Sequence, residues 1–117
     1  MQENLYHYRA RVVSVYDGDT CTVDIDLGLR AWIHQEKLRL ARINAPELTG
    51  MEKPAGLASR DFLKSLIDGK EIYIQTLKDK QEEYGRYLAE IFVQQNEARV
   101  NVNDLMVQNG HAAYKEY

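Results

Sequence analysis

The sequence predicts a small, mainly β protein in which strands close into a barrel and two helices pack beside it. Two observations lead to this fold class. Apolar residues alternate with polar ones in several short segments, and one longer amphipathic stretch interrupts them. With 117 residues, 44% of them hydrophobic, the chain can build one core, so we expect a single domain over residues 1–117.

Five strands are predicted from this alternation. Residues 8–16 and 21–27 form a hairpin around the acidic turn Asp17-Gly18-Asp19, because apolar residues recur at every second position on both sides. A third strand, long and bent, is predicted over residues 29–33 and 38–43, and two more over 70–77 and 87–93. Five short strands with a helix after the third are typical of an OB-fold barrel, whose exposed face commonly binds oligonucleotides.

Two helices complete the predicted fold. The longer covers Pro54 to Ile67 and ends at Asp68-Gly69. Its predicted apolar stripe consists of Leu57, Ala58, Phe62, Leu63, Leu66 and Ile67. The second is short; it begins after Asn101 or Asn103, either of which is a good N-cap, and ends near Asn109-Gly110.

Composition excludes several classes of protein. The formal charge of −3 argues against a broad basic surface that coats nucleic acid, so any such contact should be local. The single cysteine, Cys21, cannot form an internal disulfide and is predicted to point into the barrel. The first residues lack the basic and apolar regions of a secretory signal, which predicts a cytoplasmic protein without a membrane segment, unless a signal has been removed. We also expect a monomer.

Three charged residues in separate segments suggest phosphoryl chemistry. Arg39 lies on the third predicted strand, Glu47 follows Pro46 just beyond that strand, and Arg86 follows Gly85 before the fifth. Guanidinium groups bind phosphate oxygens in pairs and do not lose their charge, while a carboxylate can orient or deprotonate water. We therefore predict a catalytic set of Arg39, Glu47 and Arg86 that hydrolyses a phosphodiester.

Oxygen donors near these residues predict a metal site. Asp19 lies in the first turn, and the side chain of Asn44 and the carbonyl of Ala45 can join it as hard ligands for a calcium-like ion. The turn lacks the spacing of an EF-hand loop. His7, His34 and His111 have no metal-ligand spacing, so a histidine-based nuclease is not expected.

Aromatic residues supply candidates for substrate contacts. Tyr84, beside the Gly85-Arg86 turn, and Tyr114, near the end of the chain, can stack on bases of single-stranded DNA or RNA. Packing is the alternative role for both. Arg42 has the opposite strand parity to Arg39 and is predicted to be a surface or salt-bridged residue.

In these segments the chain resembles the staphylococcal nuclease (thermonuclease) family. The match runs through DGDT at 17–20, RLARINAPE at 39–47, YGR at 84–86 and VNDLMVQNGHA at 102–112. The resemblance implies an OB-fold barrel that cleaves DNA and RNA with calcium and leaves 3′-phosphates. It implies catalytic roles for Arg39, Glu47 and Arg86, and a metal-binding role for Asp19.

Departures from the family pattern keep a second function open. The family's second metal aspartate is Asn44 here, its neighbouring threonine is Ala45, and a lysine before Tyr84 is Glu83. We therefore expect weaker metal and phosphate binding. The alternative to a nuclease is a non-catalytic module that binds nucleic acid or protein; retention of all three catalytic side chains favours the enzyme.

Overall fold

The computed structural model describes residues 6–81 and 85–115 of the chain. The strands are β1 (His7–Asp17), β2 (Thr20–Gly28), β3 (Ala31–Leu40), β4 (Ile43–Asn44), β5 (Glu71–Gln81), β6 (Tyr87–Gln95), β7 (Ala98–Asn101) and β8 (Ala113–Tyr114). The helices are α1 (Lys53–Ile67), which follows the 3₁₀ turn η2 (Gly50–Glu52), and α2 (Val102–Gln108). Neither helix is long and apolar enough to cross a bilayer.

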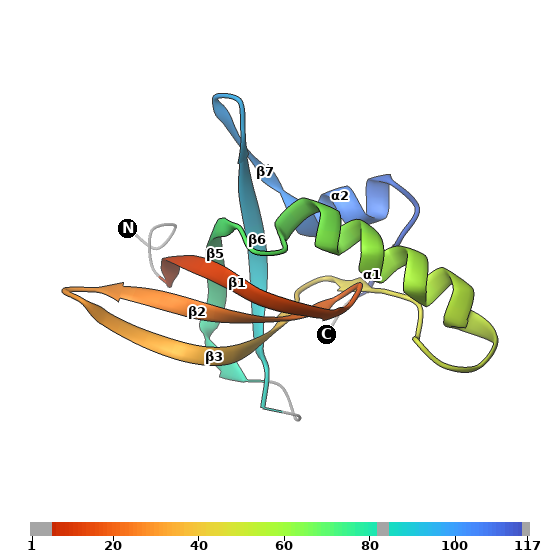
Figure 1. Cartoon of the computed structure of the whole chain (residues 1–117), viewed down its shortest axis with the longest axis horizontal. Coiled ribbons are helices and arrows are strands. Elements are labelled where there is room, and N and C mark those ends of the chain that lie inside the picture. Colours follow the sequence, from red (N-terminus) through yellow and green to blue (C-terminus); the bar gives the residue numbers. More distant parts are fainter. Residues whose placement is uncertain (1–5, 82–84, 116–117) are drawn as a thin grey trace.

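Five strands close into the predicted OB-fold barrel. The sheet order is β3-β2-β1-β5-β6-β7, with neighbours antiparallel, and a further parallel pairing of β3 with β6 joins the two sides. That closing pairing sets Leu38 opposite Tyr87 and Leu40 opposite Ala89. The β6–β7 hairpin projects beyond the barrel, and α1 crosses beside the β1–β2 turn (Figure 1).

The inward side chains of the strands form the core, as their alternation predicts. Val12, Val23, Leu38, Ile72 and Ile91 are all at most 2% exposed. Cys21 is fully buried, so its predicted inward position is confirmed; burial raises the pKa of its thiol to about 12. A buried, protonated thiol is a packing group and a poor nucleophile.

The predicted third strand is wrong at both ends. Leu29 and Arg30 have positive φ values of 55° and 67° and lie in the β2–β3 turn. Arg42 also has a positive φ, 69°, which ends β3 and separates it from the two-residue strand β4. β4 pairs with β8, a strand that the sequence did not predict, and β7 was likewise missed. Both are too short to show an alternating pattern.

The helices occur where the sequence predicts them. α2 begins after Asn101, whose side chain accepts a hydrogen bond from the backbone N–H of Asp104, so Asn101 is the N-cap and Asn103 is not. In α1, Ala58 is exposed although it was assigned to the apolar stripe, while Gly56 and Ser59 are buried. These two small residues face elements that approach the helix too closely for larger side chains.

Candidate active site

A cavity of about 660 Å³ opens at the end of the barrel beside the β1–β2 turn. All six residues predicted as catalytic or metal-binding line it: Asp19, Arg39, Asn44, Ala45, Glu47 and Arg86. They come from the β1–β2 turn, the end of β3, β4 with the loop after it, and the connection before β6. The fold therefore brings together groups that are up to 67 positions apart in the sequence (19 to 86).

Asp19 is held in place by its neighbours in the cavity wall. Its backbone N–H donates to Asp17 Oδ1 at 3.1 Å, the turn geometry typical of an aspartate two residues earlier. Its Oδ2 accepts the backbone N–H of Ala45 at 2.8 Å, and its Oδ1 lies 3.3 Å from Thr20 Oγ1. The carboxylate is thus fixed against the loop that follows β4.

Arg39 is almost fully buried, with its guanidinium forming one side of the cavity. Its Nη1 donates to the carbonyls of Leu40 at 2.8 Å and Ile43 at 3.0 Å, which fixes the plane of the group. Its Nη2 lies 3.2 Å from Asp19 Oδ2 and 3.3 Å from Asn44 Oδ1. One cationic edge therefore faces two of the proposed metal ligands.

Arg86 reaches the cavity from the connection before β6. Gly85 precedes it with φ 79°, a left-handed conformation that glycine adopts without steric cost and that turns the chain into β6. Arg86 Nη1 donates to Thr20 Oγ1 at 3.1 Å. Because the same threonine hydroxyl contacts Asp19, the β1–β2 turn links the second guanidinium to the acidic side of the cavity.

Glu47 enters the cavity from the loop after β4, and α1 supports that loop closely. The backbone N–H of Glu47 donates to Glu52 Oε1 at 3.1 Å. A Cβ added to Gly56 would lie 2.1 Å from the Glu47 carbonyl oxygen and 2.7 Å from its carbonyl carbon. Only glycine permits this approach, so the backbone of Glu47 rests directly on the helix.

A second close contact joins α1 to the β1–β2 turn. A Cβ on Gly18 would lie 1.9 Å from Ser59 Oγ and 2.8 Å from the Ala45 Cβ. Ser59 Oγ also donates to the carbonyl of His111 at 2.8 Å, which ties the segment after α2 to the same helix face. α1 thus sets the turn carrying Asp19 and the loop carrying Glu47 at a defined separation.

Several further residues, not among the predicted site residues, line the cavity. Tyr16, Asp17 and Lys37 belong to this group, along with Ser14, Val15, Thr20 and Thr22. Burial, and second the negative charge of Asp19, raise the pKa of Asp17 to about 6. Strand parity could have identified Lys37, which lies two positions before Arg39 and so shares its side of β3.

The donor set at this cavity fits a hard cation. Asp19, Asn44, the Ala45 carbonyl and Asp17 offer only oxygen atoms, which calcium prefers. Among residues 6–81 and 85–115, no three His, Cys, Asp or Glu side chains are grouped as a metal site. A bound calcium ion would therefore need the amide oxygen of Asn44, the backbone carbonyl and water molecules in addition to carboxylates.

Of the two predicted substrate tyrosines, only Tyr114 belongs to the residues that the structure describes. Tyr84 lies outside the described residues. Tyr114 is on β8 and is not part of the cavity lining; its hydroxyl donates to Asp104 Oδ1 at 2.9 Å, and this hydrogen bond raises its pKa. Tyr114 is 56% exposed, and its role as a substrate contact stays a prediction.

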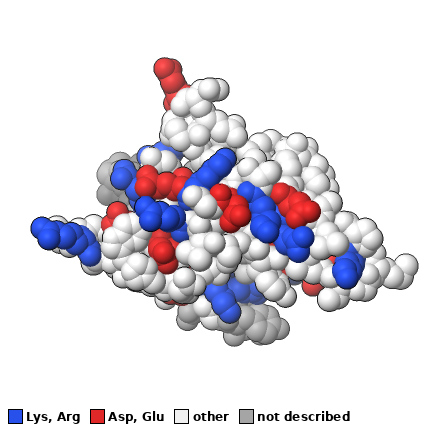
Figure 2. Space-filling view, in the orientation of Figure 1, with Lys and Arg blue, Asp and Glu red and all other residues white. Residues whose placement is uncertain are grey.

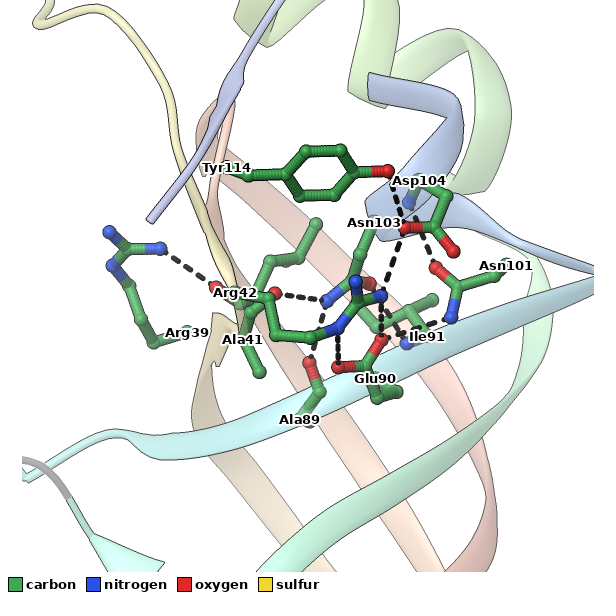
Figure 3. A network of polar contacts seen from close by, with 11 residues as sticks. Arg39, Ala41, Arg42, Ala89, Glu90, Ile91, Asn101, Asn103, Asp104 and Tyr114 are labelled. Carbon is green, nitrogen blue, oxygen red and sulfur yellow. Dashed lines mark hydrogen bonds and ion pairs between the residues drawn. The ribbon is translucent and has the colours of Figure 1, made fainter. Parts of the chain in front are cut away.

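The contacts of Arg42 confirm the prediction that this residue is salt-bridged and is not part of the site. Its Nε and Nη2 bond to Glu90 at 2.7 and 2.8 Å, and Nη2 also bonds to Asp104 at 3.0 Å. Figure 3 shows the guanidinium of Arg42 directed toward Glu90 and that of Arg39 directed away from this network. Glu90, first through its hydrogen bonds, raises the pKa of Arg42 above its usual value.

Comparison with known proteins places the fold and cavity in a family. A family model described as staphylococcal nuclease homologue matches residues 37–117. The chain belongs to the staphylococcal nuclease homologue family. The match includes Arg39, Asn44, Ala45, Glu47 and Arg86, and it begins after Asp19.

Two relatives of this nuclease-like chain are similar over most of its length. An uncharacterized protein of Methanocaldococcus jannaschii is 28% identical over 127 residues, which cover 91% of this chain and 58% of the relative. A thermonuclease of Staphylococcus hyicus is 27% identical over 110 residues, which cover 92% of this chain and 59% of the relative. The chain thus spans less than three fifths of either relative's length.

Surface charge agrees with local rather than extended contact to nucleic acid. On the face shown in Figure 2, Lys and Arg are interspersed with Asp and Glu, and no broad patch of one sign appears. The cavity lining itself is balanced, with the cations Lys37, Arg39 and Arg86 and the carboxylates Asp17, Asp19 and Glu47. Charges of both signs in one cavity are suited to binding a phosphate beside a metal ion and a catalytic base.

Proposed function

We propose that the chain is a calcium-dependent nuclease that hydrolyses phosphodiesters of single-stranded DNA or RNA. One observation carries this proposal: two guanidinium groups and a carboxylate from three separate segments line a single cavity that also contains oxygen donors for a metal. The family membership and the thermonuclease of Staphylococcus hyicus support the same chemistry.

The two arginines have the electrostatic role in this mechanism. Negative charge grows on the phosphate oxygens as a phosphodiester is attacked, and donors fixed in advance stabilise it without reorganising. Arg39 is oriented by the carbonyls of Leu40 and Ile43, and Arg86 by Thr20. Each arginine thus presents a planar, permanently charged donor at a defined place in the cavity wall.

Glu47 acts as the base or as the group that orients water. It is an exposed loop residue in the cavity lining, so water reaches it, while Gly56 and Glu52 hold its backbone. The carboxylate accepts a proton from the attacking water as the new phosphorus–oxygen bond forms. The 3′-phosphate products implied by the family resemblance require the 5′ oxygen to leave.

Asp19, Asn44 and the Ala45 carbonyl would hold the calcium ion, with Asp17 close by. When bound, calcium supplies Lewis-acid polarisation of the phosphate. Asn44 contributes an oxygen without a charge, so we expect weaker binding than an aspartate at that position would give. Arg39 remains beside both Asp19 and Asn44 and offsets part of their attraction for the ion.

A binding module without catalysis is the second candidate. The contacts of Arg39 Nη2 with Asp19 and Asn44 favour it, because they place a cation beside the groups that would otherwise hold the metal. In that case the cavity would bind a phosphate through Arg39 and Arg86 and leave it intact.

A direct assay separates the two candidates. Pure chain is incubated with single-stranded DNA and with RNA in calcium, and again in excess chelator. We expect cleavage in calcium that is lost with chelator, and 3′-phosphate ends on the products. Retention of the oligomer on the protein with no cleavage product in either condition would establish the binding module and reject the nuclease.

A further inference from the structure

The β2–β3 hairpin forms an arm that extends away from the cavity. Figure 1 shows its turn at the opposite end of the sheet from the β1–β2 turn, beyond the body of the barrel. Leu27 and Leu29 near this turn are 45% and 101% exposed, and Trp32 and Ile33 on β3 are 39% and 41% exposed. Of these four residues, only Trp32 carries an aromatic ring.

One face of this arm is continuous with the cavity wall. Thr22 on β2 and Lys37 on β3 are cross-strand partners, and both line the cavity. Side chains at every second position of a strand share a face, so Asp24 and Asp26 follow Thr22 on the same side. Asp26 pairs with Trp32, which therefore lies at the far end of the row that begins at the cavity.

The far end of this row carries an aromatic pair, Trp32 and His34. The rings of Trp32 and His34 are nearly parallel, with 6° between their planes and 6.2 Å between their centroids. His34 Nδ1 lies 3.3 Å from Asp24 Oδ1, and this contact holds the imidazole on the same face. An exposed indole of fixed orientation is the kind of platform on which single-stranded bases stack.

Three aliphatic residues of the arm lie on the other face. Ile25, Leu27 and Ile33 line a small cleft of about 110 Å³ with Tyr8 and Tyr87 on the inner side of the hairpin. The outer face carries the aromatic pair with polar and charged side chains. That combination suits a nucleobase with polar edges better than the apolar surface of a protein partner.

Charges along the outer face are largely compensated. Arg11 is the cross-strand partner of Asp24, and Asp24 and Asp26 accept backbone hydrogen bonds from Gln35 and Gly28. Lys37 stands at the cavity end of the row. We therefore expect the arm to bind nucleic acid through base stacking, with little contribution from attraction to phosphates. The affinity of this contact should depend only weakly on salt concentration.

We propose that Trp32, supported by His34, is a base-stacking subsite for the segment of single-stranded nucleic acid that leaves the cavity along β3. The proposal rests on the proposed function, because that function supplies the strand in the cavity. Thr22 and Asp26, the β2 partners of Lys37 and Trp32, are four positions apart, or ~13 Å at ~3.3 Å per strand residue. Stacked nucleotides advance ~3.4 Å each, so roughly four are needed to reach Trp32.

The chain's only tryptophan gives a direct readout of this subsite. Intrinsic fluorescence of the full chain is titrated in chelator with oligothymidylate of about 12 nucleotides, a length within the ~4–16 that one OB fold binds, and with a dinucleotide. We expect quenching of Trp32 by the longer oligomer and none by the dinucleotide, which is too short to span from the cavity to the indole.

Matched variants separate stacking from loss of fold. Trp32→Ala should bind the longer oligomer about five- to 100-fold more weakly by fluorescence polarisation of a labelled strand. Trp32→Phe should restore most of that affinity, because it keeps an aromatic face. Ile33→Ala, on the opposite face of the same strand, should bind like the unchanged chain.

The outcomes distinguish this inference from the proposed function. Calcium-dependent cleavage with no quenching, or with equal affinity for Trp32→Ala, overturns the subsite alone. Quenching by the longer oligomer without any cleavage supports the subsite and overturns the nuclease. Trp32 fluorescence could instead change with protein concentration when no oligomer is present, and show no further change when oligomer is added. That result would show that a second copy of the chain covers this face, and it would overturn the subsite.

Discussion

Arg39 and Arg42 lie three positions apart and belong to two regions with opposite properties. Arg39 lines an open cavity and places one edge of its guanidinium beside Asp19 and Asn44. Arg42 lies in a closed network, where Glu90 and Asp104 occupy its donors and Tyr114 lies 5.8 Å from its guanidinium carbon. The left-handed backbone at Arg42 ends β3. This turn is one reason why the side chains of Arg39 and Arg42 point in different directions.

The difference shows how a small barrel separates reactivity from stability. The network also contains Asn103, whose amide donates to the carbonyls of Ala41 and Ala89 and accepts from the N–H of Ile91 (Figure 3). No buried side-chain polar atom in the described residues lacks a partner. Changes in the cavity should therefore affect turnover, and changes in the network should affect the free energy of unfolding.

The largest expected effect is on catalysis. Glu47→Gln or Arg86→Ala should lower kcat by about 10²- to 10³-fold, because each removes a group that acts only on the transition state. Circular dichroism and urea denaturation should match the unchanged chain within about 1 kcal/mol. Cleavage within a few-fold of normal in either variant would remove that residue from the mechanism.

Asn103→Ala tests the other side of the comparison. It leaves the Ala41 carbonyl and the Ile91 N–H without their Asn103 partner, while the Ala89 carbonyl keeps the backbone N–H of Ala41, and we expect a loss of about 3 kcal/mol in the free energy of unfolding, measured by urea denaturation. The folded fraction should retain its kcat when rates are corrected for active protein. A loss below about 1 kcal/mol would mean that water or repacking satisfies these groups.

Gly56→Ala probes the link between helix packing and the cavity. The added Cβ must displace the carbonyl of Glu47, and a shift of about 1 Å in a reacting group can cost about 100-fold. We expect kcat to fall about ten- to 100-fold while oligomer affinity in chelator is kept.

A matched control for this change is available on the same helix. Ala58→Gly, at an exposed position, should destabilise α1 by about 1 kcal/mol without lowering kcat, since it leaves the Glu47 contact intact. Equal kcat values for the two variants and the unchanged chain would show that the Gly56 contact does not position Glu47.

Asn44→Asp sharpens the electrostatic side of the comparison. A second carboxylate beside Asp19 should tighten calcium binding several-fold, as measured by isothermal titration calorimetry. The upper limit of the gain in binding free energy is roughly 4 kcal/mol, the interaction of two unit charges at about 4 Å in an effective dielectric of ~20. Arg39, already 3.3 Å from the Asn44 amide oxygen, will take part of that gain as an ion pair. Equal or weaker affinity would reject Asn44 as a ligand.

The smallest effect is expected for Arg42→Ala. Its side chain is 46% exposed, so its ion pairs with Glu90 and Asp104 are screened by water, and about 1 kcal/mol of unfolding free energy should be lost. Its kcat should be unchanged, in contrast to the Arg86→Ala variant. A tenfold loss of kcat would show that the network and the cavity are coupled.

Much of the site was predictable from local sequence. The acidic turn between two alternating strands located Asp19. Parity along a third strand extended to Ile43 predicted that Arg39 and Arg42 face different sides, whereas in the structure β3 ends at Leu40 and Arg42 lies in the turn that follows. Lys37 and Tyr16 could have been found by the same alternation. Tyr114 could not be placed, because its position depends on the pairing of β8 with β4, two strands of two residues each that carry no periodic signal.

By itself, the sequence determined the chemical groups, their order and the faces of the strands on which they lie, because side-chain alternation is a local property of the backbone. Only the tertiary structure decided which of these groups meet. The parallel pairing of β3 with β6 closes the barrel around the cavity, and Gly56 and Ser59 let α1 seat the loop and the turn. Such contacts depend on packing distances between segments remote in sequence, which no local pattern encodes.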